Sequence, residues 1–183
     1  MNLTMNLTMD LTMNGSKIVL GTNVLGTKAI ESNLGDAYLK FQLNQHTSAV
    51  LPIKNTQEVI ILPKESVTSI PNMPAAVLGL VNWRSRIIWI VDLAKMLNLD
   101  SLNNRGQQYN TIIIRSELGL LGLVVSEIKG TSRFFADAIQ SPKSQVPHSL
   151  LAYLRGCVYQ DNDILLVLDT QAIMESAIIM NNN

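Results

Sequence analysis

The stretch GLVNWRSRIIWIVDL, Gly79–Leu93, contains the pattern from which the fold of the chain can be inferred. It is an apolar run that ends in aspartate, and two arginines and two tryptophans lie within it. A later stretch, RGCVYQDNDILLVLDT (Arg155–Thr170), repeats the order of a glycine, a polar turn and an apolar run closed by aspartate. The same pattern thus occurs twice in one chain.

The two stretches match position by position when the first is shifted by 77 residues. The coincident pairs are Gly79 and Gly156, Val81 and Val158, Ile87 and Ile164, Ile88 and Leu165, Ile90 and Val167, Val91 and Leu168, and Asp92 and Asp169. Ahead of the Pro-containing loops the shift is 72, which places Leu51 on Leu123. We interpret this as an internal duplication of a unit of about seventy residues, with halves at about 37–100 and 109–175.

Alternating and β-branched apolar residues predict strands in both halves. The expected strands are 37–43, 49–53, 55–62, 75–83, 84–93, 109–115 and 120–130, followed by a last strand pair within 150–170. AKMLNL, residues 94–99, is expected to form a short helix or an irregular turn. A single unit of this size has a marginal core, so two small barrels that share a third apolar layer are expected. The predicted class is all-β with short helices.

Composition argues against several classes of function. The 14 basic residues balance the 14 acidic ones, so the basic surface typical of nucleic-acid binding is not expected. Cys157 is the only cysteine, and His46 and His148 lie apart, so neither a disulfide nor a metal site is predicted. No nucleophile–base pair or phosphate-binding glycine loop is evident, so we expect neither an enzyme nor a bound cofactor. No apolar run is long enough to span a membrane, and we expect a cytoplasmic protein.

The first 36 residues have a different composition from the rest. MNLTMNLTMDLTMN repeats a four-residue unit, and its Met and Leu residues could form a helical stripe. Asn, Asp and Thr, however, are poor helix formers. We expect residues 1–36 to be a disordered low-complexity leader, with a short partner-binding helix as the alternative. Residues 178–183 are expected to be a tail.

The body, residues 37–177, resembles the CheW-like domain, the coupling module of bacterial chemotaxis arrays. The resemblance is carried by Gly79, by the turn Asn82-Trp83-Arg84-Ser85 and by the apolar run that ends at Asp92-Leu93. Further matches are Thr56-Gln57-Glu58-Val59, the proline-spaced loop at 70–74, Gly122-Leu123-Val124-Val125 and Arg155-Gly156. No single motif is decisive, and the resemblance depends on their order, spacing and duplication.

The resemblance implies two intertwined five-stranded SH3-like β-barrels with a hydrophobic seam between them. It implies a non-catalytic adaptor without cofactors, which connects the cytoplasmic tip of a chemoreceptor to the regulatory domain of a CheA-type histidine kinase. Contact with the membrane would then be indirect, through the receptors. Chemotaxis, pilus motility and phototaxis remain equally compatible pathways.

The resemblance also implies a receptor-facing surface that contains Glu58, Asn82, Trp83, Arg84 and Ile87. Arginine and tryptophan are enriched at protein interfaces, in agreement with this assignment. Arg155 and Gly156 are a second candidate contact. Arg86 is expected to be solvated, and Asp92 and Asp169 to cap strand ends or form turns.

Three residues depart from the family pattern near this surface. Ser85 stands where the family has glycine, so a turn that requires positive φ would be strained or reshaped. Trp89 stands where the family has proline, and Trp83 where it has leucine. These departures lie where a partner would dock, so a divergent partner is expected, whereas the expected fold is unchanged. A generic β-barrel interaction module outside any chemosensory array remains the alternative function, and a salt-sensitive mobility shift with DNA would favour a module of that kind.

Overall fold

The computed structural model describes residues 35–101, 106–142, 146–160 and 163–181, with side chains as far as residue 177. The expectation for the leader lies outside the described residues as far as residue 34, and so does the end of the expected tail. The first strand begins at Asp36, and the last helix continues to Asn181. Among the described residues, no helix is both long enough and apolar enough to cross a membrane.

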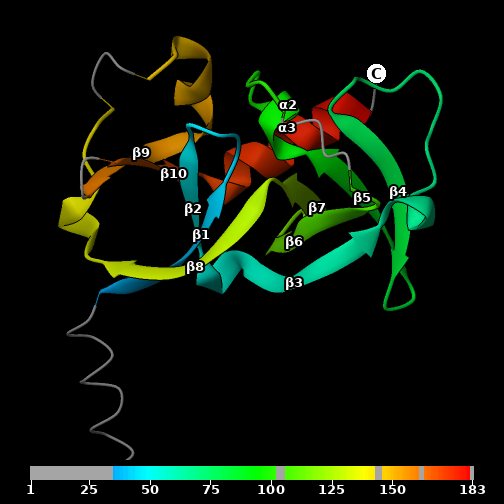
Figure 1. The fold of residues 1–183 in the computed structure, drawn as a ribbon, viewed down its shortest axis with the longest axis horizontal. Helices are drawn as coiled ribbons and strands as arrows, with labels where there is room; N and C mark the ends of the chain where they lie inside the picture. The colour runs from blue at the N-terminus through cyan, green and yellow to red at the C-terminus, as the bar shows by residue number, and fades with distance from the viewer. Residues whose placement is uncertain (1–34, 102–105, 143–145, 161–162, 182–183) are drawn as a thin grey trace, which may run out of the picture. The chain divides into compact units, whose positions relative to one another are not determined.

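Within the described residues, ten strands form two five-stranded sheets, which confirms the predicted all-β class with two five-stranded units (Figure 1). Sheet A contains β1 (Asp36–Gln42), β2 (Ser48–Pro52), β8 (Glu127–Phe134), β9 (Leu154–Gln160) and β10 (Asp163–Leu168). Sheet B contains β3 (Thr56–Pro63), β4 (Val77–Trp83), β5 (Arg86–Asp92), β6 (Gln108–Ser116) and β7 (Gly119–Val125). The helices among the described residues are α2 (Leu93–Met96), α3 (Thr170–Asn181) and the 3₁₀ turns η1 (Ile53–Asn55), η2 (Lys64–Ser66), η3 (Ala136–Ala138) and η4 (His148–Tyr153).

The two sheets have the same topology. Sheet A has the order β8-β1-β2-β10-β9 and sheet B the order β3-β6-β7-β5-β4. The strand numbers at matching positions of the two orders always differ by five, as for β8 and β3 or β1 and β6. Each sheet also contains one parallel pair, β2–β10 in sheet A and β5–β7 in sheet B. The sheets are therefore two copies of one design, as the internal duplication predicts.

Each sheet takes strands from both halves of the sequence. The first half supplies β1 and β2 to sheet A and β3, β4 and β5 to sheet B, and the second half makes up the remainder. The chain passes from one sheet to the other just before β3 and just before β8. These two strands run along one side of the sheets, and α2 and α3 lie on the other side (Figure 1). The predicted intertwining of the two units is confirmed.

The interior consists of three apolar clusters, because successive residues of a strand point to opposite faces. On β6, Ile113 packs inside sheet B, whereas Ile112 and Ile114 face a core shared by both sheets. On β2, Val50 packs inside sheet A, whereas its neighbours Ala49 and Leu51 join the shared core. Strands that are buried on both faces read as continuous apolar runs. The expected third apolar layer is this shared core.

Two isolated bridges show where the second half has extra residues relative to the first. One bridge joins Thr68 to Leu80, and the other joins Gln140 to Cys157. Thr68 and Gln140 differ by 72 positions, and Leu80 and Cys157 by 77, which are the two shifts found in the sequence. The same contact is thus made in both halves, and the extra residues lie in the loop between the bridging positions.

Two backbone segments approach each other closely at each bridge, which explains why Gly79 and Gly156 occupy matching positions in the two halves. A Cβ atom on Gly79 would lie 2.2 Å from the carbonyl oxygen of Thr68, and one on Gly156 would lie 2.6 Å from that of Gln140. Their φ angles are 142° and 158°, which side chains disfavour. Glycine is required at both positions by the crossing segment, and Gly156 therefore has a structural role.

One predicted strand is wrong in its extent. The segment 120–130 is not a single strand, because β7 ends at Val125 in sheet B and β8 starts at Glu127 in sheet A. Ser126 lies between them, and its N–H donates to the carbonyl oxygen of Gln42 at 3.0 Å. The backbone of Ser126 is thus hydrogen-bonded where the chain passes from sheet B to sheet A. For this reason no turn signal separates β7 from β8 in the sequence.

Cys157 lies in the core, and the two repeated aspartates cap helices, whereas the sequence predicted strand-end caps or turns for them. Cys157 is fully buried, and burial raises the pKa of its thiol. Asp92 accepts a hydrogen bond from the N–H of Lys95 at the start of α2. Asp169 accepts from the N–H groups of Gln171 and Ala172 at the start of α3. Both aspartates therefore cap the helix that follows the last strand of their half.

Candidate protein-interaction site

The β4–β5 hairpin ends in a two-residue turn formed by Arg84 and Ser85. Their φ angles are 50° and 63°, and the pair Trp83–Arg86 closes the turn. Positive φ at both central residues defines a type I′ turn, which matches the twist of antiparallel strands and favours asparagine and glycine. The expectation of a strained turn at Ser85 agrees with this geometry. The turn presents the Arg84 side chain at the tip of the hairpin, where 65 % of it is exposed.

Glu58 on β3 binds Trp83, which precedes the turn, and Arg84, the first residue of the turn. Its Oε1 accepts a hydrogen bond from Nη2 of Arg84 at 2.9 Å, and its Oε2 accepts from Nε1 of Trp83 at 3.1 Å. The guanidinium carbon of Arg84 lies 4.9 Å from the centre of the Trp83 ring. One carboxylate thus holds an arginine and a tryptophan against each other. We call these three residues the Glu58 cluster.

The Glu58 cluster also joins the two outer strands of sheet B. β3 and β4 lie at opposite ends of the strand order, so ladder hydrogen bonds do not connect them. The register between β3 and β6 shifts between Thr56 and Glu58, which marks a β-bulge at Gln57. Bulges increase strand twist and redirect side chains. The bulge lies where the side chain of Glu58 contacts the β4–β5 hairpin.

The remaining predicted residues lie outside the cluster. Asn82 and Ile87 are cross-strand partners in the hairpin, and both are exposed, with 66 % of Ile87 accessible. The flanking pair, Val81 and Ile88, is buried in the sheet B core. Because side chains alternate along strands, Asn82 and Ile87 lie on the outer face of the hairpin and Trp83 on the inner one. The five predicted residues therefore form a cluster of three beside an exposed pair.

The second candidate contact belongs to the other sheet. Arg155 lies on β9, and its Nε donates to Oδ2 of Asp169 at 3.4 Å. It also lines a cavity of about 320 Å³ with Tyr38 and Lys54. By the shift of 77, Arg155 corresponds to Leu78 in the first half. Arg155 and Gly156 are thus not brought together with the Glu58 cluster.

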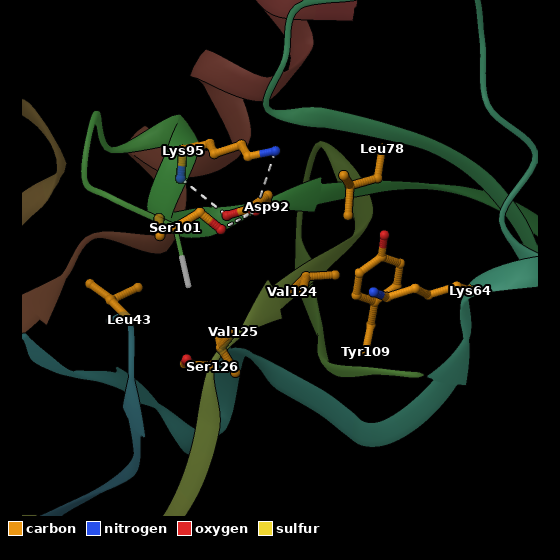
Figure 2. A pocket seen from close by; sticks show the side chains of 11 residues that line it. Leu43, Lys64, Leu78, Asp92, Lys95, Ser101, Tyr109, Val124, Val125 and Ser126 are labelled. Carbon is orange, nitrogen blue, oxygen red and sulfur yellow. Dashed lines mark hydrogen bonds and ion pairs between the residues drawn. The ribbon is translucent and has the colours of Figure 1, made fainter. Parts of the chain in front are cut away.

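A cavity that no sequence motif predicted lies at the end of β5, where Asp92 lines it. It measures about 190 Å³, and Leu78, Tyr109 and Val124 form part of its wall (Figure 2). Oδ2 of Asp92 accepts from Oγ of Ser101 at 2.7 Å and lies 4.0 Å from Nζ of Lys95. Burial, and to a smaller extent the charge of Asp92, raise the pKa of Tyr109. Both carboxylate oxygens of Asp92 accept hydrogen bonds from within the chain, and Figure 2 shows the carboxylate turned toward Lys95 and Ser101.

A second cavity was also missed, at the end of sheet B where the β4–β5 and β6–β7 hairpins lie. It measures about 280 Å³, and its walls contain Gln57, Trp83, Arg84, Arg86, Arg115 and Leu120. Arg115 comes from the end of β6, and its Nη1 donates to Oε1 of Gln57 at 3.3 Å. Arg115 belongs to no recognisable sequence motif. Only the pairing of β3 with β6 brings it to this cavity. Within the described ranges, no three His, Cys, Asp or Glu side chains are grouped to hold a metal ion.

Known proteins resemble this chain in sequence and in fold. The family model described as the CheW-like domain matches residues 37–177. A chemotaxis protein CheW from Treponema pallidum is 29 % identical over 139 residues, covering 74 % of this chain and 80 % of that protein. A chemotaxis protein CheW from Thermotoga maritima is 26 % identical over 137 residues, covering 75 % and 86 %. The crystal structure of the scaffolding protein TtCheW from Thermoanaerobacter tengcongensis matches with a TM-score of 0.65 at 22 % identity, covering 74 % and 90 %.

Proposed function

This chain belongs to the CheW-like domain family, and from that premise we propose that it is the adaptor that couples chemoreceptors to a CheA-type histidine kinase. The family model covers most of the chain, and both curated relatives are chemotaxis proteins. The adaptor is non-catalytic and acts by binding its partners at the same time. The alternative of a generic β-barrel module has no support from these comparisons.

The proposed partners are the cytoplasmic tip of a receptor and the regulatory domain of the kinase. Binding to such partners places the adaptor in the cytoplasm, with the membrane contacted only through the receptor. The pathway that it serves, whether swimming, pilus motility or phototaxis, is set by the partners that it meets. The adaptor itself supplies shape and surface chemistry.

The surface proposed to face the receptor is the Glu58 cluster with the exposed pair Asn82 and Ile87. The observation that carries this proposal is the double contact of Glu58 with Arg84 and Trp83. It holds an exposed arginine in one orientation before any partner arrives, so less side-chain freedom is lost on binding. Ile87 adds an exposed apolar side chain on the same hairpin. Arginine and tryptophan are the residues most often found at the energetic centre of interfaces.

Co-sedimentation with receptor-containing membranes and kinase tests this surface. Arg84→Ala should weaken binding of the chain by about 1–2 kcal/mol, the scale of an interface residue that matters. Its circular dichroism spectrum should not change, because the lost ion pair is exposed and contributes little to stability. Arg133→Ala removes an exposed arginine from β8 in sheet A and is the matched control. Equal binding of Arg84→Ala and the wild type would remove the Glu58 cluster from the receptor interface.

A further inference from the structure

The cavity between the two hairpins at the end of sheet B has an excess of positive charge. Three of the residues that line it are arginines, namely Arg84, Arg86 and Arg115. They come from the β4–β5 turn, the start of β5 and the end of β6. The whole chain is neutral, with 14 basic and 14 acidic residues, so this is a local concentration of one sign.

The three arginines differ in how they are paired. Arg84 binds the carboxylate of Glu58. Arg115 donates to the neutral side-chain oxygen of Gln57. Within the part of the chain that the structure describes, the side chain of Arg86 has no hydrogen bond or ion pair. Three guanidinium groups thus line the cavity, and among the described residues only that of Arg84 has an acidic partner. Like charges held together repel unless an anion joins them.

We propose that Arg86 and Arg115 bind a carboxylate of an acidic segment in a protein partner, with Trp83 as the apolar wall of the pocket. This proposal rests on the adaptor function, because it names the chemistry by which a partner is recognised at the same surface. Guanidinium groups bind carboxylates through paired, charge-assisted hydrogen bonds. Both arginines lie on strands, and strands position side chains more rigidly than loops do.

The neighbouring Glu58 favours a carboxylate over a phosphate as the ligand. Its own contacts show how this surface holds such a group, with one oxygen on a guanidinium and the other on the Trp83 indole. The charge of Glu58 repels any second anion, and it repels a phosphate more strongly because a phosphate carries almost twice the charge of a carboxylate. A cavity of about 280 Å³ has room for an acidic side chain.

An NMR titration of the full chain tests the pocket directly. The probe is the capped peptide acetyl-Glu-Glu-Glu-amide, and acetyl-Gln-Gln-Gln-amide is its neutral control. We expect the Nε1–H resonance of Trp83 and the Nε–H resonances of Arg86 and Arg115 to shift in a saturable manner with the acidic peptide only. In the double variant Arg86→Gln/Arg115→Gln, peptide affinity should fall at least about tenfold, since two charge-assisted contacts are lost. Arg133→Gln, which removes the same charge in sheet A, should retain full affinity.

Two results of this titration would overturn the proposal. One is an equal loss of affinity in Arg133→Gln, which would mean that the peptide responds only to overall charge. The other is tighter binding of inorganic phosphate than of the peptide, which would make the pocket a site for phosphate groups. Thermal unfolding of each variant, monitored by circular dichroism, verifies that the fold is retained.

Co-sedimentation with receptor membranes and kinase separates failure of the pocket from failure of the adaptor function. If the wild-type chain does not co-sediment, the adaptor function itself fails. If the wild type and the double variant co-sediment equally well, the adaptor function stands and the acidic-segment pocket is wrong. We expect the wild type to bind and the double variant to bind at least about fivefold more weakly, a typical effect for charges at an interface.

Discussion

Ser85 occupies a backbone conformation that suits glycine better than serine. Its φ of 63° lies in the left-handed region, where a side chain costs about 1–2 kcal/mol. Ser85→Gly removes this cost, although glycine also gains freedom in the unfolded chain. We expect a net stabilisation of up to about 1 kcal/mol, or a rise in melting temperature of about 2–4 °C.

The matched control for this substitution is Ser69→Gly. Ser69 is exposed and is not among the described residues with positive φ, so glycine there should lower the melting temperature slightly. Differential scanning calorimetry measures both variants. A decrease in the melting temperature of Ser85→Gly would mean that the turn is not strained at this position.

The residues of the candidate site differ in how far sequence could predict them. Glu58, Trp83 and Arg84 are recognisable because they lie in family motifs, and the structure brings them into contact. Arg115 is far from them in sequence and ends an apolar run with no distinguishing pattern. Its contact with Gln57 depends on a bulged register between two strands. Local pattern cannot specify such a register, because partner strands are chosen by tertiary packing.

The helices α2 and α3 follow β5 and β10, and a repeated aspartate stands immediately before each helix. Asp92 caps α2, and Asp169 caps α3 through two backbone N–H groups. Replacing an N-cap aspartate by alanine costs about 0.5–2 kcal/mol. We expect Asp169→Ala to lower the free energy of unfolding by this amount, measured by urea denaturation with an unchanged m-value.

Asp92→Ala should cost more than Asp169→Ala. Asp92 is 9 % exposed, and it also accepts a hydrogen bond from Ser101, which would lose its partner. Glu175→Ala on α3 is a matched control, because it removes an exposed carboxylate from the helix without touching a cap. Equal stability of all three variants would show that the repeated aspartates do not act as caps.

Most strands could be predicted from sequence, but their division between sheets could not. The alternation of apolar residues predicts a half-buried strand such as β1, and continuous isoleucines predict a fully buried one such as β6. The change from β7 to β8 was missed because Ser126 keeps its backbone paired while the chain passes from one sheet to the other. The helix or turn expected over 94–99 is the short helix α2, which starts one residue earlier at Leu93.

At the scale of the whole molecule, neither sequence half can form a complete sheet. Residues up to Asp92 contribute only two strands of sheet A and three of sheet B. The shared core likewise draws on strands from both halves. We therefore expect residues 35–101 and residues 106–183, expressed separately, to show no cooperative thermal transition. Expressed together, they should recover one transition, monitored by circular dichroism.

The intact chain is the reference for that experiment. Its two sheets share one apolar core, so both should unfold in a single transition. A cooperative transition in either isolated half would show that the halves are independent domains, and the account of intertwined sheets would then be wrong. The same intertwining makes the two sheets one rigid body, on which the proposed partner surfaces keep a fixed spacing.

This rigid body is proposed to couple receptor to kinase without chemistry of its own. The most direct measurement is the rate of kinase autophosphorylation in a reconstituted mixture of receptor-containing membranes and CheA-type kinase, with and without the chain. Receptor control of the rate should appear only when the chain is present, and Arg84→Ala should reduce it. The same receptor-controlled rate without the chain would contradict the proposed coupling.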